Sequence, residues 1–203
     1  MSYQKTYQSP FSWRYGSQQM REIWGEFHTR LLWREIWASL AEVQVGYKLV
    51  TDEQAAEIRS KVEDIDLDLS SEVEEDIQHD LMAELEVFAN QCPTAGGTLH
   101  LGATSMDIKD NVVIIQLKVA LKLILEELLQ LLEALTGLID RWADLPVIGF
   151  THLQPAEPTT LGYRLAQPAQ DLLACYLELK GLEESIKEKV FRERLVRVLL
   201  LLP

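Results

Sequence analysis

Apolar residues recur at intervals of three and four along most of the chain, which is the spacing of one face of an α-helix. Residues 18–49 show this pattern, with Ile23, Trp24, Phe27, Leu31 and Leu32 on the apolar positions. Alternation at a period of two, the pattern of strands, is scarce. Glycine and proline gather in a few clusters that mark boundaries between helices. The pattern predicts an all-α fold.

Helix starts are marked by capping signals. Thr51 with Gln54 three residues later forms a capping box before a short helix. Ser71 with Glu74 repeats the signal and predicts a helix that runs to about residue 91. A loop with Gly and Pro follows at residues 92–101.

Asp107 is expected to cap a helix of roughly 36 residues, about 55 Å long at 1.5 Å per residue. Leucine and isoleucine cover most of its circumference, so it must be buried among other helices. A final helix is expected from near Thr160 to about Lys189, with Pro168 in its interior causing a kink or a cost in stability.

Such helix lengths predict an elongated up-and-down bundle. We expect a small N-terminal helical domain at residues 1–106, followed at residues 107–203 by the first part of a long-helix bundle, incomplete as it stands. One copy of the chain cannot cover the apolar surface of the central helices. The sequence therefore predicts a homo-oligomer.

The net charge of the chain limits the classes of partner that it can bind. The chain has 203 residues, a net charge of −13 and a pI near 4.7, which argues against nucleic acid as a partner. The apolar run at residues 112–138 is interrupted by lysines and glutamates, so no membrane span is expected. The first ten residues lack an apolar signal core, so no secretion is expected. We expect Cys92 and Cys175 to be two buried thiols in a reducing cytoplasm, with a disulfide between them as the alternative. Residues 187–203 are basic and then apolar, which favours a truncated or altered terminus.

Two polar stretches stand out as candidate chemistry. Thr104 and Ser105 precede the long helix, where hydroxyls and unpaired N–H groups suit a carboxylate or phosphate, although ordinary capping is an equal alternative. His152 lies between Thr151 and Gln154 just before the last helix. A lone histidine is more often structural, but these neighbours suit the orientation of an imidazole or a substrate carboxylate.

Other candidate groups are weaker on their own. His79 and Asp80 are expected inside a helix, where adjacent side chains point about 100° apart and need not interact. Arg14 and Tyr15 supply a guanidinium and a phenol suited to a phosphate. No histidine or cysteine spacing of a zinc site, no phosphate loop and no Rossmann glycine pattern is found, so no metal or cofactor is expected.

The segment at residues 100–107, HLGATSMD, closely resembles a signature of the adenylosuccinate lyase family within the fumarase/aspartase superfamily. Residues 149–160, GFTHLQPAEPTT, resemble the family's second signature region. Arg14-Tyr15 and Gln78-His79-Asp80 match two further family sites in the same order. The resemblance covers roughly residues 1–186.

This resemblance implies an all-α tetramer whose active sites combine three subunits. It implies a β-elimination that releases fumarate from adenylosuccinate and from a succinylated aminoimidazole carboxamide ribotide in purine biosynthesis, with no cofactor. It implies that His152 is the general acid, that His79 assists, and that Asp80 helps to orient His79. His100 would line the site, and Gln78 would contact the substrate. Thr104 and Ser105 would hold a substrate carboxylate, and Arg14 and Tyr15 would hold the ribotide phosphate.

The chain also departs from the family pattern. Family members are more than twice as long and carry a catalytic serine in an S-S-x-M-P-x-K loop, which is absent here. The Lys-Gly segment that follows the last helix in the family is absent as well. These departures imply an incomplete enzyme that is inactive alone. Another superfamily lyase or a cycloisomerase, or a non-catalytic helical assembly module, remain the alternatives.

Overall fold

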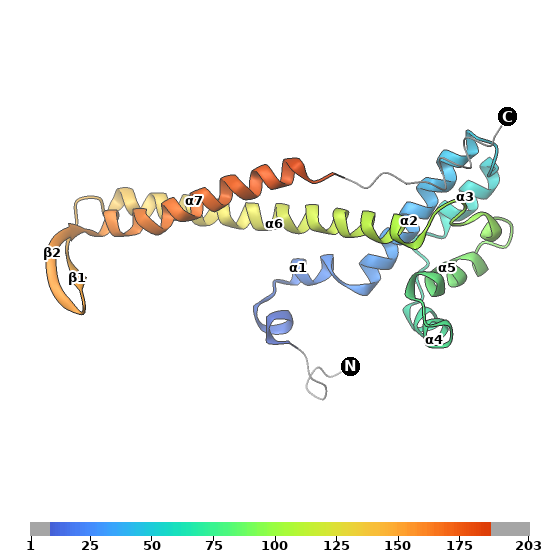
Figure 1. Ribbon diagram of the computed structural model, residues 1–203, viewed down its shortest axis with the longest axis horizontal. Coiled ribbons are helices and arrows are strands. Elements are labelled where there is room, and N and C mark those ends of the chain that lie inside the picture. Colours follow the sequence, from blue (N-terminus) through green and yellow to red (C-terminus); the bar gives the residue numbers. More distant parts are fainter. Residues whose placement is uncertain (1–8, 188–203) are drawn as a thin grey trace. The chain divides into compact units, whose positions relative to one another are not determined.

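The computed structural model describes residues 9–187 (Figure 1). These residues form two compact units, residues 9–116 and 117–186, and each is described here by itself. Apart from one β-hairpin the described chain is helical, so the predicted all-α class is confirmed. The basic and apolar tail that the sequence singles out lies outside the described residues from residue 188 on.

Short helices make up the first unit. In chain order the elements are η1 (Phe11–Tyr15), α1 (Gln18–Ile23), α2 (Glu26–Val45), α3 (Asp52–Ser60), α4 (Leu67–Ile77), α5 (Asp80–Asn90), η2 (Gly96–Thr98) and the first part of α6 (Ser105–Arg141). Trp37 of α2 and Phe88 of α5 are fully buried, with ring centroids 6.1 Å apart. Ile58, Leu81 and Ile108 complete a core that α2, α3, α5 and α6 share.

A buried ion-pair network crosses this core. The Glu84 carboxylate of α5 is fully buried and accepts from Arg34 Nε at 2.5 Å and from Ser70 Oγ at 2.6 Å. The guanidinium of Arg30 lies 3.4 Å from the second carboxylate oxygen. Because buried charges persist only when paired, these contacts fix α2, α4 and α5 against one another.

The helix expected over residues 18–49 is interrupted, and that prediction was wrong in this respect. α1 ends at Ile23, and Gly25 takes an extended conformation (φ −73°, ψ 148°) as the N-cap of α2. Its carbonyl accepts from both the backbone N–H and the hydroxyl of Thr29, at 3.0 and 3.1 Å. A new helix therefore starts at Glu26, although the apolar spacing continues across the break.

The predicted helix from Ser71 to about residue 91 is also two helices. α4 starts at Leu67, because the Asp66 carboxylate accepts from the Leu69 N–H at 3.0 Å. Ser71 is inside the helix, where its hydroxyl donates to the Leu67 carbonyl at 2.8 Å instead of capping. α4 then ends at Gln78, whose φ of 55° is left-handed, and His79 becomes the N-cap of α5.

The loop before α6 is held by α3. The capping box of Thr51 and Gln54 is confirmed. Further along α3, one oxygen of Glu57 accepts from the N–H groups of Thr94 and Ala95 at 3.2 and 2.7 Å, and from the Thr94 hydroxyl at 2.5 Å. These bonds fix the start of the segment that carries His100.

The second unit holds the rest of α6, a hairpin and α7 (Leu161–Ser185). α6 has 37 residues and starts at Ser105; Asp107 is its third residue and accepts from the Thr104 N–H at 3.0 Å. Where the sequence predicted no strands, β1 (Pro146–Thr151) and β2 (Gln154–Thr160) pair antiparallel, with a bulge between Ile148 and Phe150. Figure 1 shows this hairpin as a curved two-stranded ribbon between α6 and α7.

The last helix begins as predicted. The Thr160 hydroxyl accepts from the Tyr163 N–H at 3.2 Å and caps α7. The helix ends at Ser185, four residues before the expected end, and Pro168 lies inside it. Gly162 is needed at the start, because a Cβ there would come within 2.7 Å of the Ala143 Cα.

Two further sequence expectations concern thiols and membranes. Cys92 is buried as expected, whereas Cys175 is exposed on α7, so the expectation of two buried thiols was wrong for one of them. No helix within residues 9–187 is both long and apolar enough to cross a membrane.

Candidate active site

His79 stands at the junction of α4 and α5. The prediction that it lies inside a helix was wrong, because the left-handed backbone of Gln78 ends α4 one residue before it. Its Nδ1 accepts from the Met82 N–H at 3.4 Å, as an N-cap side chain does. The other ring nitrogen, Nε2, lies 3.5 Å from the hydroxyl oxygen of Ser105.

Ser105 is the first residue of α6, so the beginnings of α5 and α6 meet at this histidine. Helix N-termini carry partial positive charge and outward N–H groups, and both favour an anion. The preceding Thr104 is exposed, and its N–H donates to the Asp107 carboxylate. The structure thus brings Ser105 to His79 and gives Thr104 a place beside them.

Asp80 is held by a lysine. Nζ of Lys109, one turn after Ser105 on α6, lies 2.5 and 2.7 Å from the two oxygens of the Asp80 carboxylate. Burial works to raise the pKa of this carboxyl, but the hydrogen bonds from Lys109 and from the Leu81 N–H outweigh burial and keep the pKa below its usual value. Asp80 is therefore a carboxylate at neutral pH.

His100 lies on the loop before α6 with a left-handed φ of 59°. Its Nδ1 accepts from the indole Nε1 of Trp37 at 3.0 Å, and the two rings meet edge to face. Gln44, also from α2, donates to the carbonyl of the next residue, Leu101, at 2.9 Å. Burial lowers the pKa of His100; the Asp107 carboxylate opposes this effect and the His79 ring adds to it.

Arg14 and Tyr15 lie apart from this cluster in the chain, on the short π-helical turn η1. Tyr15 is exposed, and its ring contacts that of Phe11 with centroids 6.1 Å apart. Their role as phosphate ligands stays a prediction.

The remaining predicted residues belong to the second unit. Thr151 and Gln154 pair at the closed end of the hairpin, and His152 lies between them in the two-residue turn. His152 and Leu153 have φ of 50° and 64°, as a type I′ turn requires. All of these side chains are exposed. His152 is thus at a turn tip, and not directly before a helix as the sequence indicated.

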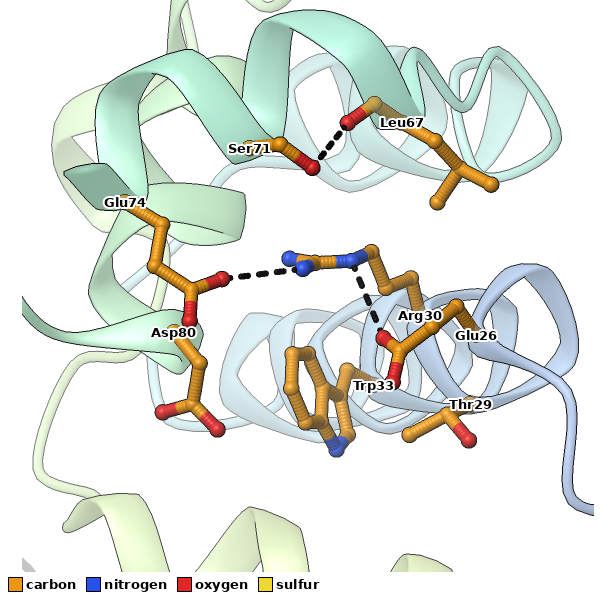
Figure 2. Close-up of a pocket in the computed structure, with 8 residues that line it drawn as sticks. All are labelled: Glu26, Thr29, Arg30, Trp33, Leu67, Ser71, Glu74 and Asp80. Carbon is orange, nitrogen blue, oxygen red and sulfur yellow. Dashed lines mark hydrogen bonds and ion pairs between the residues drawn. The ribbon is translucent and has the colours of Figure 1, made fainter. Parts of the chain in front are cut away.

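A pocket of about 470 Å³ opens on the first unit beside Asp80 (Figure 2). Figure 2 shows the Arg30 guanidinium between Glu26 and Glu74, with ion-pair distances of 3.7 and 3.1 Å. The pocket lining comprises Glu26, Thr29, Arg30, Trp33, Leu67, Ser71, Glu74 and Asp80. Arg30 pairs with Glu26 and Glu74, and Asp80 pairs with Lys109, so the charged groups of the pocket are already engaged. Within residues 9–187 there is also no group of three or more side chains placed to hold a metal ion.

Sequence reasoning missed Lys109 and Trp37. Lys109 follows Ser105 by four residues, the helical spacing that places both on one face, and this was the available signal. Trp37 carries no such signal, because it is 63 residues from His100 in the chain.

A family model described as lyase matches residues 19–190. The chain belongs to this lyase family. Among curated relatives, adenylosuccinate lyase of Schistosoma mansoni is 37% identical over 190 residues, covering 93% of this chain and 38% of the relative. Adenylosuccinate lyase of Saccharomyces cerevisiae is 37% identical over 171 residues, covering 82% of this chain and 36% of the relative. The chain thus spans somewhat more than a third of the length of these lyases.

Solved lyase-family structures share the fold. A fumarate lyase from Mesorhizobium sp. BNC1 has a TM-score of 0.76 at 25% identity, covering 87% of this chain and 41% of that one. The 3-carboxy-cis,cis-muconate lactonizing enzyme from Pseudomonas putida has a TM-score of 0.80 at 27% identity, covering 87% and 42%. The resemblance read from the sequence motifs is confirmed at the level of the family.

Proposed function

We propose that this chain carries part of the active site of an adenylosuccinate lyase, which eliminates fumarate from adenylosuccinate and from the succinylated aminoimidazole carboxamide ribotide. The observation that carries the proposal is the meeting of His79 with Ser105 where α5 and α6 begin. The relatives at 37% identity support the choice of substrate.

The proposed chemistry follows from this arrangement. A base, which the family resemblance places on a serine-bearing loop not found in this chain, takes the proton beside a carboxylate and builds negative charge on the succinyl group. The C–N bond then breaks with its electrons leaving on nitrogen. Donors at the start of α6 stabilise the developing charge, and we assign Thr104 and Ser105 to the substrate carboxylate. His79 assists from the other side of that position, with Asp80 and Gln78 beside it and His100 lining the site.

The remaining roles rest on the second signature region at residues 149–160 and on Arg14 and Tyr15 near the start of the chain. We assign His152 as the general acid that protonates the departing nitrogen, with Thr151 and Gln154 orienting it. Arg14 and Tyr15 hold the ribotide phosphate. The reaction as proposed needs no metal or cofactor.

We also propose a homo-oligomer, a tetramer in the family, in the cytoplasm. The support is the exposed apolar surface of the second unit, which includes Ile124, Leu129, Leu131 and Leu138 on α6 and Leu173, Leu177 and Leu182 on α7. Apolar surface of this extent on helices is ordinarily covered by further helices. Light scattering of the purified chain tests this proposal, and a stable monomer would contradict it.

A cycloisomerase is the second candidate, favoured by the TM-score of 0.80 to the muconate lactonizing enzyme. The two candidates differ in substrate, since a muconate carries no nucleotide. They can therefore be separated by binding.

The test is a proton NMR titration of the whole chain, whose four histidines give few imidazole signals. Adenylosuccinate is expected to shift the signals of His79 and His100, while His28 of α2 serves as the internal reference. A response to 3-carboxymuconate alone would favour the cycloisomerase, and no response to either would contradict both. Fumarate release followed by absorbance then tests the expectation that this chain is inactive alone: release above background that is lost in His79→Gln and His152→Ala would contradict it.

A further inference from the structure

Lys109 contacts the predicted catalytic pair without belonging to any motif. Its ammonium donates to both oxygens of Asp80 at 2.5 and 2.7 Å. The same ammonium lies 5.9 Å from the centre of the Trp33 ring. Its side chain is largely shielded, with 25% exposed. Its position is thus fixed by a carboxylate and an aromatic ring.

Nδ1 of His79 lies between two groups with opposite requirements. The Met82 N–H, 3.4 Å away, can only donate and needs this nitrogen without a proton. Oδ1 of Asp80, 3.5 Å away, can only accept and needs the nitrogen to carry one. A neutral imidazole has a single ring proton, so the stronger of these two partners decides which nitrogen holds it.

Lys109 weakens Asp80 as a hydrogen-bond acceptor for Nδ1 of His79. Oδ1 of Asp80 already accepts from Lys109 and from the Leu81 N–H at 2.7 Å. The adjacent ammonium also offsets the carboxylate charge that would attract a ring proton. We propose that Lys109 is a positioning residue that sets the tautomer of His79, keeping Nδ1 bare so that the neutral ring carries its proton on Nε2.

The tautomer of His79 determines whether Nε2 donates or accepts a hydrogen bond in the candidate site. Nε2 is the nitrogen that lies 3.5 Å from the Ser105 hydroxyl oxygen at the start of α6. With its proton on Nε2, His79 donates a hydrogen bond to a substrate oxygen held there and does not take a proton from the substrate. This role rests on the proposed function, whereas the tautomer itself does not.

The experiment is a two-bond ¹H–¹⁵N correlation spectrum of the ¹⁵N-labelled whole chain, in alkaline buffer where a free imidazole is uncharged. His79→Gln assigns the His79 signals. The wild type is expected to show a proton on Nε2. In Lys109→Met the released Asp80 carboxylate captures the proton on Nδ1, and the tautomer ratio changes about tenfold, as when a charge-assisted hydrogen bond replaces a neutral one.

Three further variants make the test specific. Lys109→Arg keeps a positive charge and is expected to restore the wild-type ratio. Lys122→Met removes the same charge from an exposed position on the same helix and is expected to leave it unchanged. The double variant Lys109→Met with Asp80→Asn returns the proton to Nε2, because no carboxylate remains to hold it.

Several results would overturn the proposal. A wild-type His79 ring with its proton on Nδ1 would overturn it before any variant is made. A folded Lys109→Met variant with the wild-type tautomer ratio would also overturn it. An equal change in Lys122→Met would do so as well. The spectrum is recorded without substrate, so its outcome is separate from the lyase proposal. Adenylosuccinate binding with the wrong tautomer removes only the role of Lys109. The expected tautomer without adenylosuccinate binding removes only the lyase.

Discussion

The indole Nε1 of Trp37 lies 3.0 Å from Nδ1 of His100, and the indole N–H can only donate. Nδ1 of His100 therefore accepts, and a proton on it would break the bond to Trp37. Burial lowers the pKa of the same ring. Both effects favour a neutral His100 whose remaining ring proton is on Nε2.

Replacing His100 with glutamine should change how stability depends on pH. The folded pKa of His100 is lowered, so the unfolded chain binds more protons, and the contribution of His100 to stability is fully present above about pH 6.5. That contribution is lost as pH falls through the folded pKa. Urea unfolding from about pH 8 to 5 should show a shallower decline for His100→Gln than for the wild type. Equal slopes would contradict this reading.

Trp37→Phe keeps an aromatic ring in the core but removes the N–H donor and some ring volume. Without that donor, protonation of Nδ1 no longer breaks a hydrogen bond, and the pKa of His100 should rise. An NMR titration of His100 measures the change. Trp142→Phe in the second unit is the control and should leave this titration alone; a Trp37→Phe titration identical to the wild type would rule out the proposed effect.

Glu84→Gln should be strongly destabilising. The variant leaves Arg30 and Arg34 buried without their shared carboxylate, a loss of about 3–5 kcal/mol in the free energy of unfolding. Glu86→Gln, two residues away on α5 and exposed, should change it by less than about 0.5 kcal/mol. Denaturant unfolding compares the two, and similar values would argue against the network as a stabilising unit.

Gly96→Ala should destabilise the loop before His100. A Cβ at this position would lie 2.4 Å from the Ala89 carbonyl oxygen, so the backbone must move, at a cost of about 1–3 kcal/mol. At the neighbouring Gly97 a Cβ meets nothing within 4 Å, and Gly97→Ala should be close to neutral. Thermal unfolding distinguishes them; a Gly97→Ala variant as unstable as Gly96→Ala would point to backbone freedom and not to crowding.

The sequence predicted those features whose determinants are close together in the chain. The box of Thr51 and Gln54 joins residues three apart, and the apolar spacing of α6 extends over its whole length. The same kind of signal failed at Ser71, because Asp66 caps the helix earlier and the left-handed Gln78 ends it. Apolar spacing continues through that break from Ile77 to Leu81, so it gives no warning.

The contacts that shape the candidate site join distant residues. Asp80 and Lys109 are 29 positions apart, and no periodic pattern relates them. The motifs singled out His79 and Ser105, and the fold brings them together. The hairpin was missed because three prolines, Pro146, Pro155 and Pro158, lie within its strands and obscure any alternation.

Of the non-glycine residues with left-handed backbone in the described part of the chain, Gln78, His100 and His152 are predicted site residues, and Lys48 and Leu153 are not. Each conformation costs about 1 kcal/mol relative to glycine. Selection for thermal tolerance alone would therefore favour glycine at positions 78, 100 and 152, and would remove the side chains to which the proposed function assigns roles. At Lys48, replacement by glycine would remove the same backbone strain without removing a predicted site residue.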